Sequence, residues 1–121
     1  GSAYDFVQSR RIDVADPSAA GHDASLVIDQ PESERPVAEL TAPNGMRLRM
    51  WTDQPCMQLY TAGGLGVHAV PAAGPVHQRF AGLCLEAQGY PDAMANPNFD
   101  SILCSPEQPY LQRTRIEIAR Q

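Results

Sequence analysis

The segment that most constrains the fold is a hairpin signature in residues 37–52. The runs "VAELTA" (37–42) and "MRLRMWT" (46–52) flank Asn44-Gly45. An Asn-Gly pair between two such runs is the strongest local signal of a β-hairpin, because both residues tolerate a positive φ. Alternation gives the second arm one apolar face, which carries Met46, Leu48 and Met50. The sequence therefore predicts a hairpin with one apolar and one polar face.

Four further segments have the composition of strands, and no segment keeps helical spacing over three turns. These predicted strands are residues 25–29, 56–62, 79–88 and 111–119. Pro and Gly, which make up 20 of the 121 residues, separate them. We therefore expect an all-β fold, an antiparallel β-sandwich. So few strands would form a sheet with a second face to cover, and the chain holds no obvious covering layer.

Charge and cysteine content exclude several classes of function. The net charge is −5, every basic residue is an arginine, and no arginine cluster exceeds Arg10-Arg11, so we expect no nucleic-acid partner. No apolar run approaches the ~20 residues that span a bilayer, so we expect no membrane partner. The three cysteines, Cys56, Cys84 and Cys104, form no C-x-x-C pair, which argues against a disulfide framework or a structural zinc site. Buried thiols in a reducing cytoplasm are the expected state.

One acidic residue, Glu86, stands inside the apolar run "AGLCLEAQ" (81–88). Alternation places Glu86 on the same face as Phe80, Gly82 and Cys84. Most strand carboxylates simply face solvent. These neighbours are not typical of a solvated face, however, and a desolvated carboxylate is a stronger base. Two interpretations stay open on this evidence: a solvated acid, or a general base in a cleft.

Three longer segments carry a resemblance to a known family. They are "DQPCMQLYTAGGL" (53–65), "AGLCLEAQGYPDAMANPNF" (81–99) and "SILCSPEQPYLQRTRIEI" (101–118). Together with "YDF" (4–6) and "GHDASLVI" (21–28), they resemble the C-terminal part of the aldose 1-epimerase (galactose mutarotase) family. The resemblance implies that residues 1–121 are the C-terminal portion of a larger β-supersandwich whose N-terminal part is absent.

The resemblance also implies roles for three side chains. Glu86 falls where the family has its general base, which takes the proton from the anomeric hydroxyl of an aldose. Asp23 and Gln58 fall where a carboxylate and an amide bind sugar hydroxyls. The implied activity is interconversion of α and β anomers of a monosaccharide such as an aldohexose. The reaction needs an acid and a base, and we expect no metal or cofactor.

The chain departs from the family pattern at its histidines. The family's general acid is a histidine from a segment that this chain lacks, and His22 stands where an aromatic residue is more usual. His68 and His77 lie in a long loop outside any family motif, where a histidine is more often solvated than catalytic. We therefore expect the isolated chain to be inactive or nearly so, and to need the missing part or a second copy of itself. The alternative is a non-catalytic carbohydrate-binding β-sandwich module.

Overall fold

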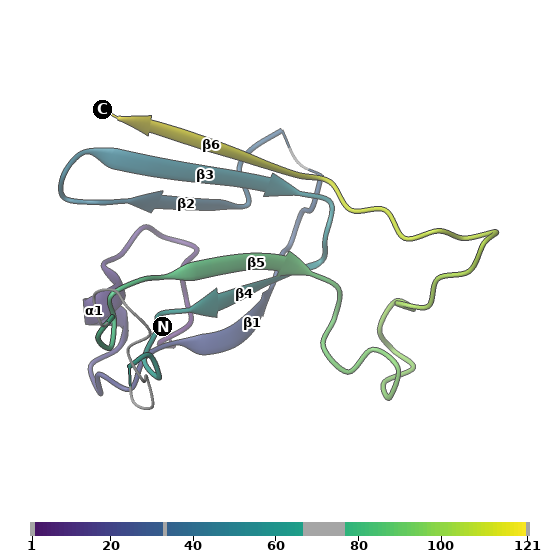
Figure 1. Ribbon diagram of the computed structural model, residues 1–121, viewed down its shortest axis with the longest axis horizontal. Coiled ribbons are helices and arrows are strands. Elements are labelled where there is room, and N and C mark those ends of the chain that lie inside the picture. The colour runs from purple at the N-terminus through teal and green to yellow at the C-terminus, as the bar shows by residue number, and fades with distance from the viewer. Residues whose placement is uncertain (1, 33, 67–76, 121) are drawn as a thin grey trace. The chain divides into compact units, whose positions relative to one another are not determined.

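A computed structural model describes residues 2–32, 34–66 and 77–120 of the chain (Figure 1). Its elements in chain order are α1 (Ile12–Ala15), β1 (Asp23–Val27), β2 (Ala38–Thr41), β3 (Met46–Thr52), β4 (Cys56–Tyr60), β5 (Cys84–Gln88) and β6 (Thr114–Arg120). The strands form two three-stranded antiparallel sheets, with orders β1-β4-β5 and β2-β3-β6. The predicted all-β fold is confirmed, and these sheets are the elements from which a β-sandwich is built.

The chain divides into two compact units. The first unit comprises Gly1–Leu26 and Gln58–Glu86, and the second comprises Val27–Met57 and Ala87–Gln121. Each has its own buried side chains. Those of the first unit include Ala15, His22, Leu59, Thr61 and Ala62. Those of the second unit include Met50, Thr52, Gln54, Cys56, Met57 and Ala93.

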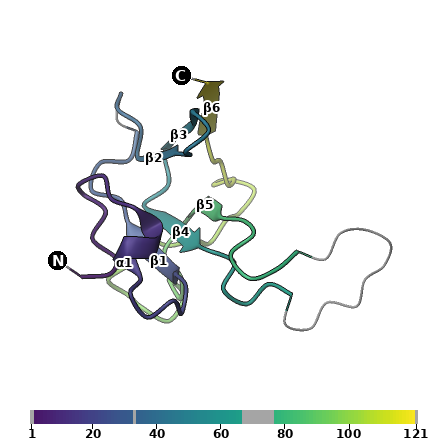
Figure 2. The same ribbon diagram turned by 90° about the vertical axis from the view of Figure 1, so that its left-hand side faces the viewer.

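The predicted hairpin forms as β2 and β3. Their antiparallel register runs from Ala38 opposite Met50 to Thr41 opposite Arg47. The Ala42 carbonyl accepts a hydrogen bond from the Gly45 amide (3.0 Å), and Gly45 has a φ of +83°, which a glycine adopts without strain. In Figure 2 the three strands of this sheet are seen nearly end-on, with β3 between β2 and β6. The apolar face expected from alternation includes Met50, which is buried.

The predicted fourth strand is shorter than its sequence pattern suggested. Strand β5 begins at Cys84, whereas the expected strand began at residue 79. The reason is a turn at Phe80, where φ is +62° and the amide donates to the Ala62 carbonyl (3.0 Å). Period-2 alternation does not continue through a left-handed residue, so the assignment of Phe80 to the face of Glu86 was wrong, and Gly82 lies before the start of β5.

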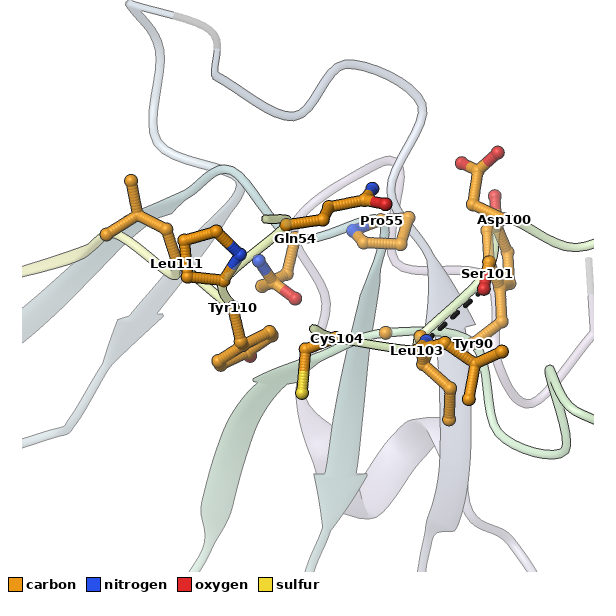
Figure 3. Close-up of a pocket in the computed structure, with 13 residues that line it drawn as sticks. Gln54, Pro55, Tyr90, Asp100, Ser101, Leu103, Cys104, Tyr110 and Leu111 are labelled. Atoms are coloured by element: carbon orange, nitrogen blue, oxygen red, sulfur yellow. Dashed lines mark hydrogen bonds between the residues drawn. The ribbon is translucent and has the colours of Figure 1, made fainter. Parts of the chain in front are cut away.

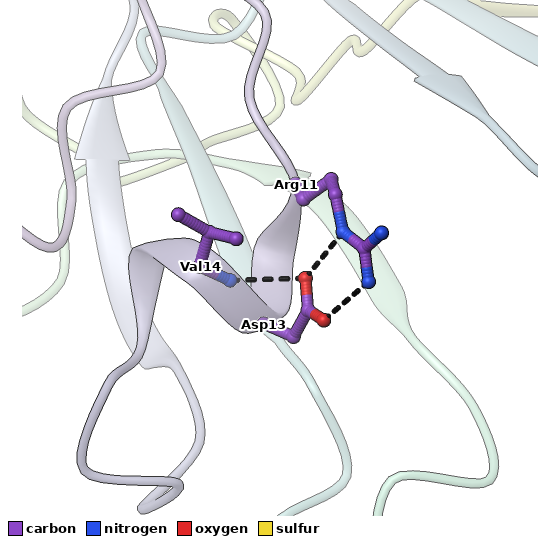
Figure 4. Close-up of polar contacts among 3 residues, drawn as sticks. All are labelled: Arg11, Asp13 and Val14. Carbon is purple, nitrogen blue, oxygen red and sulfur yellow. Dashed lines mark hydrogen bonds and ion pairs between the residues drawn. The ribbon is translucent and has the colours of Figure 1, made fainter.

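The single turn of helix α1 carries an exposed ion pair (Figure 4). Arg11 donates from Nε (2.9 Å) and Nη2 (2.6 Å) to the two carboxylate oxygens of Asp13. The same carboxylate accepts from the Val14 amide (3.0 Å), where an acidic group complements the unpaired amides of a helix start. The guanidinium holds the pKa of Asp13 below its ordinary value. Both side chains are mostly exposed, so the pair adds little stability.

The prediction of buried thiols is confirmed for Cys56 and is wrong for Cys84 and Cys104. Cys56 is 1% exposed on β4, whereas Cys84 and Cys104 are exposed and free. Cys84 is the first residue of β5, and Cys104 lies in the exposed segment that leads to β6. Among the residues described, none lies in a helix that is long and apolar enough to cross a membrane.

Candidate active site

The first sheet brings two of the predicted site residues into contact. Asp23 begins β1 and Gln58 lies in the middle of β4, which is the central strand of that sheet. Gln58 Nε2 donates to Asp23 Oδ1 over 2.6 Å. The carboxylate and the amide are thus held together although 35 positions separate them in the sequence.

The strand register explains this contact. The Thr61 amide donates to the His22 carbonyl (2.9 Å), and the Ile28 amide donates to the Pro55 carbonyl (2.8 Å). These bonds set an antiparallel register in which Ser25 lies opposite Gln58. Asp23 is then the diagonal neighbour of Gln58 on the same face, within reach of a long side chain.

Glu86 lies on β5, the other neighbour of β4. Met57 and Leu59 are buried on one face of β4, whereas the other face is buried at Cys56 and partly exposed at Gln58 and Tyr60. This second face is therefore open from Gln58 onward. On β5 Glu86 is exposed and Leu85 and Ala87 are half-buried. Exposure and alternation indicate that Glu86 shares the open face with Gln58. Glu86 is exposed, so none of the described residues provides the covered surroundings that the second interpretation of this acid requires.

His22 is the residue whose role sequence reasoning missed. Its side chain is 2% exposed, its Nε2 lies 3.0 Å from the Ala3 carbonyl, and its ring packs edge-on against Tyr4 and Phe6. Because the carbonyl only accepts, Nε2 donates to it, and the buried Nδ1 has no hydrogen-bond partner among the described residues. The signal was present, since the family more often has an aromatic residue at this position.

His22 also anchors the start of β1 next to Asp23. Its amide donates to Thr61 Oγ1 (2.7 Å), and its carbonyl accepts from the Thr61 amide. The ring therefore fixes the segment Ala3–Phe6, and the backbone fixes the position of Asp23 relative to β4. Of the two loop histidines, His77 is exposed, and His68 lies outside the described residues.

A hollow with a volume of about 430 Å³ lies within the second unit (Figure 3). Most of its wall comes from the segment 100–111, in which Ser101 Oγ accepts from the Leu103 amide (3.2 Å). Gln54, Pro55, Gly89 and Tyr90 complete it. None of the predicted site residues lines this hollow, since Asp23, Gln58 and Glu86 all belong to the first unit.

Comparisons with known proteins show the family of this chain. A family profile described as aldose 1-epimerase matches residues 1–117. The chain belongs to the aldose 1-epimerase family. It is similar to the galactose mutarotase of Rattus norvegicus, with 37% identity over 73 residues, which are 60% of this chain and 21% of that protein. The Homo sapiens galactose mutarotase is 36% identical over 69 residues, 57% of this chain and 20% of that protein.

The matched region is a small part of these relatives. A third one, the galactose mutarotase of Sus scrofa, is 34% identical over 73 residues, again 60% of this chain and 21% of the relative. The chain thus spans about one fifth of the length of the curated relatives it matches. Membership of the family is therefore shown.

Proposed function

We propose that this chain carries the general base and part of the sugar-binding face of an activity that interconverts the α and β anomers of an aldose. The observation that carries the proposal is the 2.6 Å contact between Gln58 and Asp23 on the open face of the sheet that also holds Glu86. A carboxylate beside a primary amide suits sugar hydroxyls, because each hydroxyl both donates and accepts a hydrogen bond. Asp23 Oδ2 and Gln58 Oε1 are the acceptors that this contact leaves for substrate.

The reaction assigns a separate role to Glu86. Its carboxylate removes the proton from the C1 hydroxyl, an acid protonates the ring oxygen, and the bond between C1 and the ring oxygen breaks to give the open aldehyde. Rotation about C1–C2 presents the other face of the aldehyde. Ring closure with both proton transfers reversed then yields the second anomer, so no atom or electron is gained or lost. The carboxylate and the acid return to their starting protonation states.

The acid is the part that the described residues do not supply on this face. His22 is buried with its Nε2 at the Ala3 carbonyl, and His77 is an exposed loop residue. We propose that the acid comes from the remainder of an epimerase domain or from a second copy of the chain, and that the isolated chain is nearly inactive. A cytoplasmic location, expected from the thiols, also stays a prediction.

Chemical rescue by imidazole tests this assignment. The rate of mutarotation of α-galactose and of α-glucose would be followed by polarimetry with the chain, with imidazole buffer at pH 7, and with both together. If imidazolium replaces the missing acid, the combined rate exceeds the sum of the separate rates for the wild-type chain. The Glu86→Gln chain gives only that sum, because it lacks the base.

Other results would overturn parts of the proposal. Strong acceleration by the chain without imidazole, abolished by Glu86→Gln, would show that the chain already contains its acid. Sugar binding that needs Asp23, with no imidazole effect, would identify a carbohydrate-binding module. Neither binding nor rescue would refute the proposed function.

A further inference from the structure

Strand β6 forms an open edge of the second sheet. Its inner edge pairs with β3 along its whole length, from Thr114 opposite Thr52 to Arg120 opposite Met46. No strand among residues 2–32, 34–66 and 77–120 pairs with its outer edge (Figure 2). An open edge presents a row of amides and carbonyls that can pair with another strand, and proteins usually block or cover such edges.

The two faces of β6 differ sharply. Ile116 and Ile118 are 54% and 65% exposed, so the apolar face continues to the open edge without cover. On the polar face the Arg115 guanidinium lies 3.7 Å from the centre of the Trp51 ring. Glu117 Oε1 lies 3.7 Å from Arg49 Nη1, and the Glu117 side chain keeps 49% exposure. Glu117 can therefore accept a second cation from outside the sheet.

We propose that β6 pairs antiparallel with β6 of a second copy of this chain, about a two-fold axis at Ile116. In this register Ile116 lies opposite its own copy, and Ile118 lies opposite Thr114. Arg115 of each copy lies opposite Glu117 of the other, which makes two symmetric ion pairs on the polar face. Opposite charges directly across an antiparallel pair stabilise it.

The charges of Arg115 and Glu117 favour this register over the registers next to it. A two-fold axis at Arg115 would place the two arginines opposite each other, and an axis at Glu117 would place the two glutamates opposite each other. An axis between residues would put an arginine opposite an isoleucine, which mixes the two faces. The axis at Ile116 is the register near the strand centre that gives ion pairs without a like-charge pair. This pairing joins the β2-β3-β6 sheets of the two copies into one six-stranded sheet, and the apolar face of that sheet continues across the axis.

A charge swap tests the pairing, with sedimentation equilibrium as the measurement. We expect the wild-type chain to dimerise and Glu117→Arg to raise the dissociation constant at least tenfold, because two arginine pairs then face each other. The double variant Arg115→Glu/Glu117→Arg restores opposite charges and returns the constant to within about threefold of wild type. The control Glu39→Arg removes the 2.7 Å contact of Glu39 with Arg49 on the far strand β2 and leaves dimerisation unchanged.

Disulfide trapping tests the axis itself. In a Cys84→Ser/Cys104→Ser background, Ile116→Cys forms a covalent dimer on oxidation, because residue 116 meets its copy. Ile118→Cys in the same background forms little, since it faces Thr114. The inference would be overturned if the wild-type chain stayed monomeric at hundreds of micromolar, or if the disulfide formed faster through residue 118 than through residue 116. It would also be overturned if the double variant dimerised no more tightly than Glu117→Arg. The pairing uses none of Asp23, Gln58 and Glu86, so this test is independent of the proposed function.

Discussion

At the scale of single residues, the buried ring of His22 has the largest expected effect on the stability of the first unit. His22→Ala removes the ring between Tyr4 and Phe6 and the bond to the Ala3 carbonyl, and should lower the free energy of unfolding by about 3 kcal/mol. His22→Phe keeps a ring and loses only the hydrogen bond, at about 1 kcal/mol. Urea unfolding followed by fluorescence measures both. Equal losses for the two variants would show that ring packing is not what His22 contributes.

Asp23 provides the corresponding test of binding. Asp23→Asn replaces a charged acceptor by a neutral one, and a hydrogen bond to a charged group contributes about 1.5–3 kcal/mol. We therefore expect the dissociation constant for galactose or glucose to rise about tenfold or more, measured by calorimetry. Asp29→Asn, at an exposed carboxylate two residues after β1, is the matched control and should bind as wild type. An unchanged constant for Asp23→Asn would remove Asp23 from the site.

At the scale of elements, Asp53 fastens the turn between β3 and β4 to the residue before β6. One carboxylate oxygen accepts from Gln54 Nε2 (2.8 Å), the other accepts from the Arg113 amide (3.0 Å), and the Asp53 amide donates to the Arg113 carbonyl (3.2 Å). The bond from Gln54, then that from the Arg113 amide, hold the pKa of Asp53 below its ordinary value of 3.8.

This lowered pKa predicts a pH dependence of stability. The folded chain favours the ionised form of the Asp53 carboxylate. This carboxylate therefore stabilises the fold above about pH 4, and the stabilisation is lost as the pH falls through the lower pKa that Asp53 has in the folded chain. Wild type should therefore be more stable than Asp53→Asn at pH 7, and the difference should shrink towards pH 2. Urea midpoints of both chains at the two pH values measure it. An equal difference at pH 7 and pH 2 would contradict the role of the charge.

The turn of the β2–β3 hairpin gives a second test at this scale. Gly45→Ala forces a side chain into a backbone with φ of +83° and should cost about 1 kcal/mol of unfolding free energy. Gly82→Ala is the matched control, because a Cβ at Gly82 meets nothing within 4 Å and its φ is not in the left-handed region. It should be neutral or slightly stabilising. Thermal unfolding of the two variants would separate them, and equal midpoints would contradict the turn assignment.

Local pattern predicted the elements well where it alone decides the structure. The bounds of β3, Met46–Thr52, are those of the alternating run, and the Asn-Gly turn lies where it was expected. Prediction failed where distant contacts decide. Strand β5 begins late because Phe80 bonds to Ala62, and β6 begins at Thr114, directly after Arg113 bonds to Asp53.

The same distinction applies to the candidate site. Family resemblance pointed to Asp23 and Gln58, and the structure brings these two side chains together. Alternation placed Glu86 on a face with Phe80, Gly82 and Cys84, whereas in the structure Glu86 is exposed and the chain turns at Phe80. The burial of His22 could not be read from its neighbours in sequence, since the carbonyl that it meets is 19 positions away.

At the scale of the whole molecule, the chain spans about one fifth of the length of the curated relatives it matches, and its described residues leave two surfaces open. One is the face that carries Asp23, Gln58 and Glu86, and the other is the edge of β6 with Ile116 and Ile118 exposed. The first needs an acid for catalysis, and the second has the charge pattern of a strand that pairs with its own copy.

The most direct test of the account is a titration of the isotope-labelled chain with galactose, followed by amide shifts in heteronuclear NMR spectra. We expect the amides of Asp23, Gln58 and Glu86 and their neighbours on β1, β4 and β5 to shift together along one saturation curve. Amides of β2 and β3 should stay in place. Shifts confined to the hollow around Tyr90 and Tyr110, or no shift at concentrations of tens of millimolar, would contradict a sugar-binding face on the first sheet.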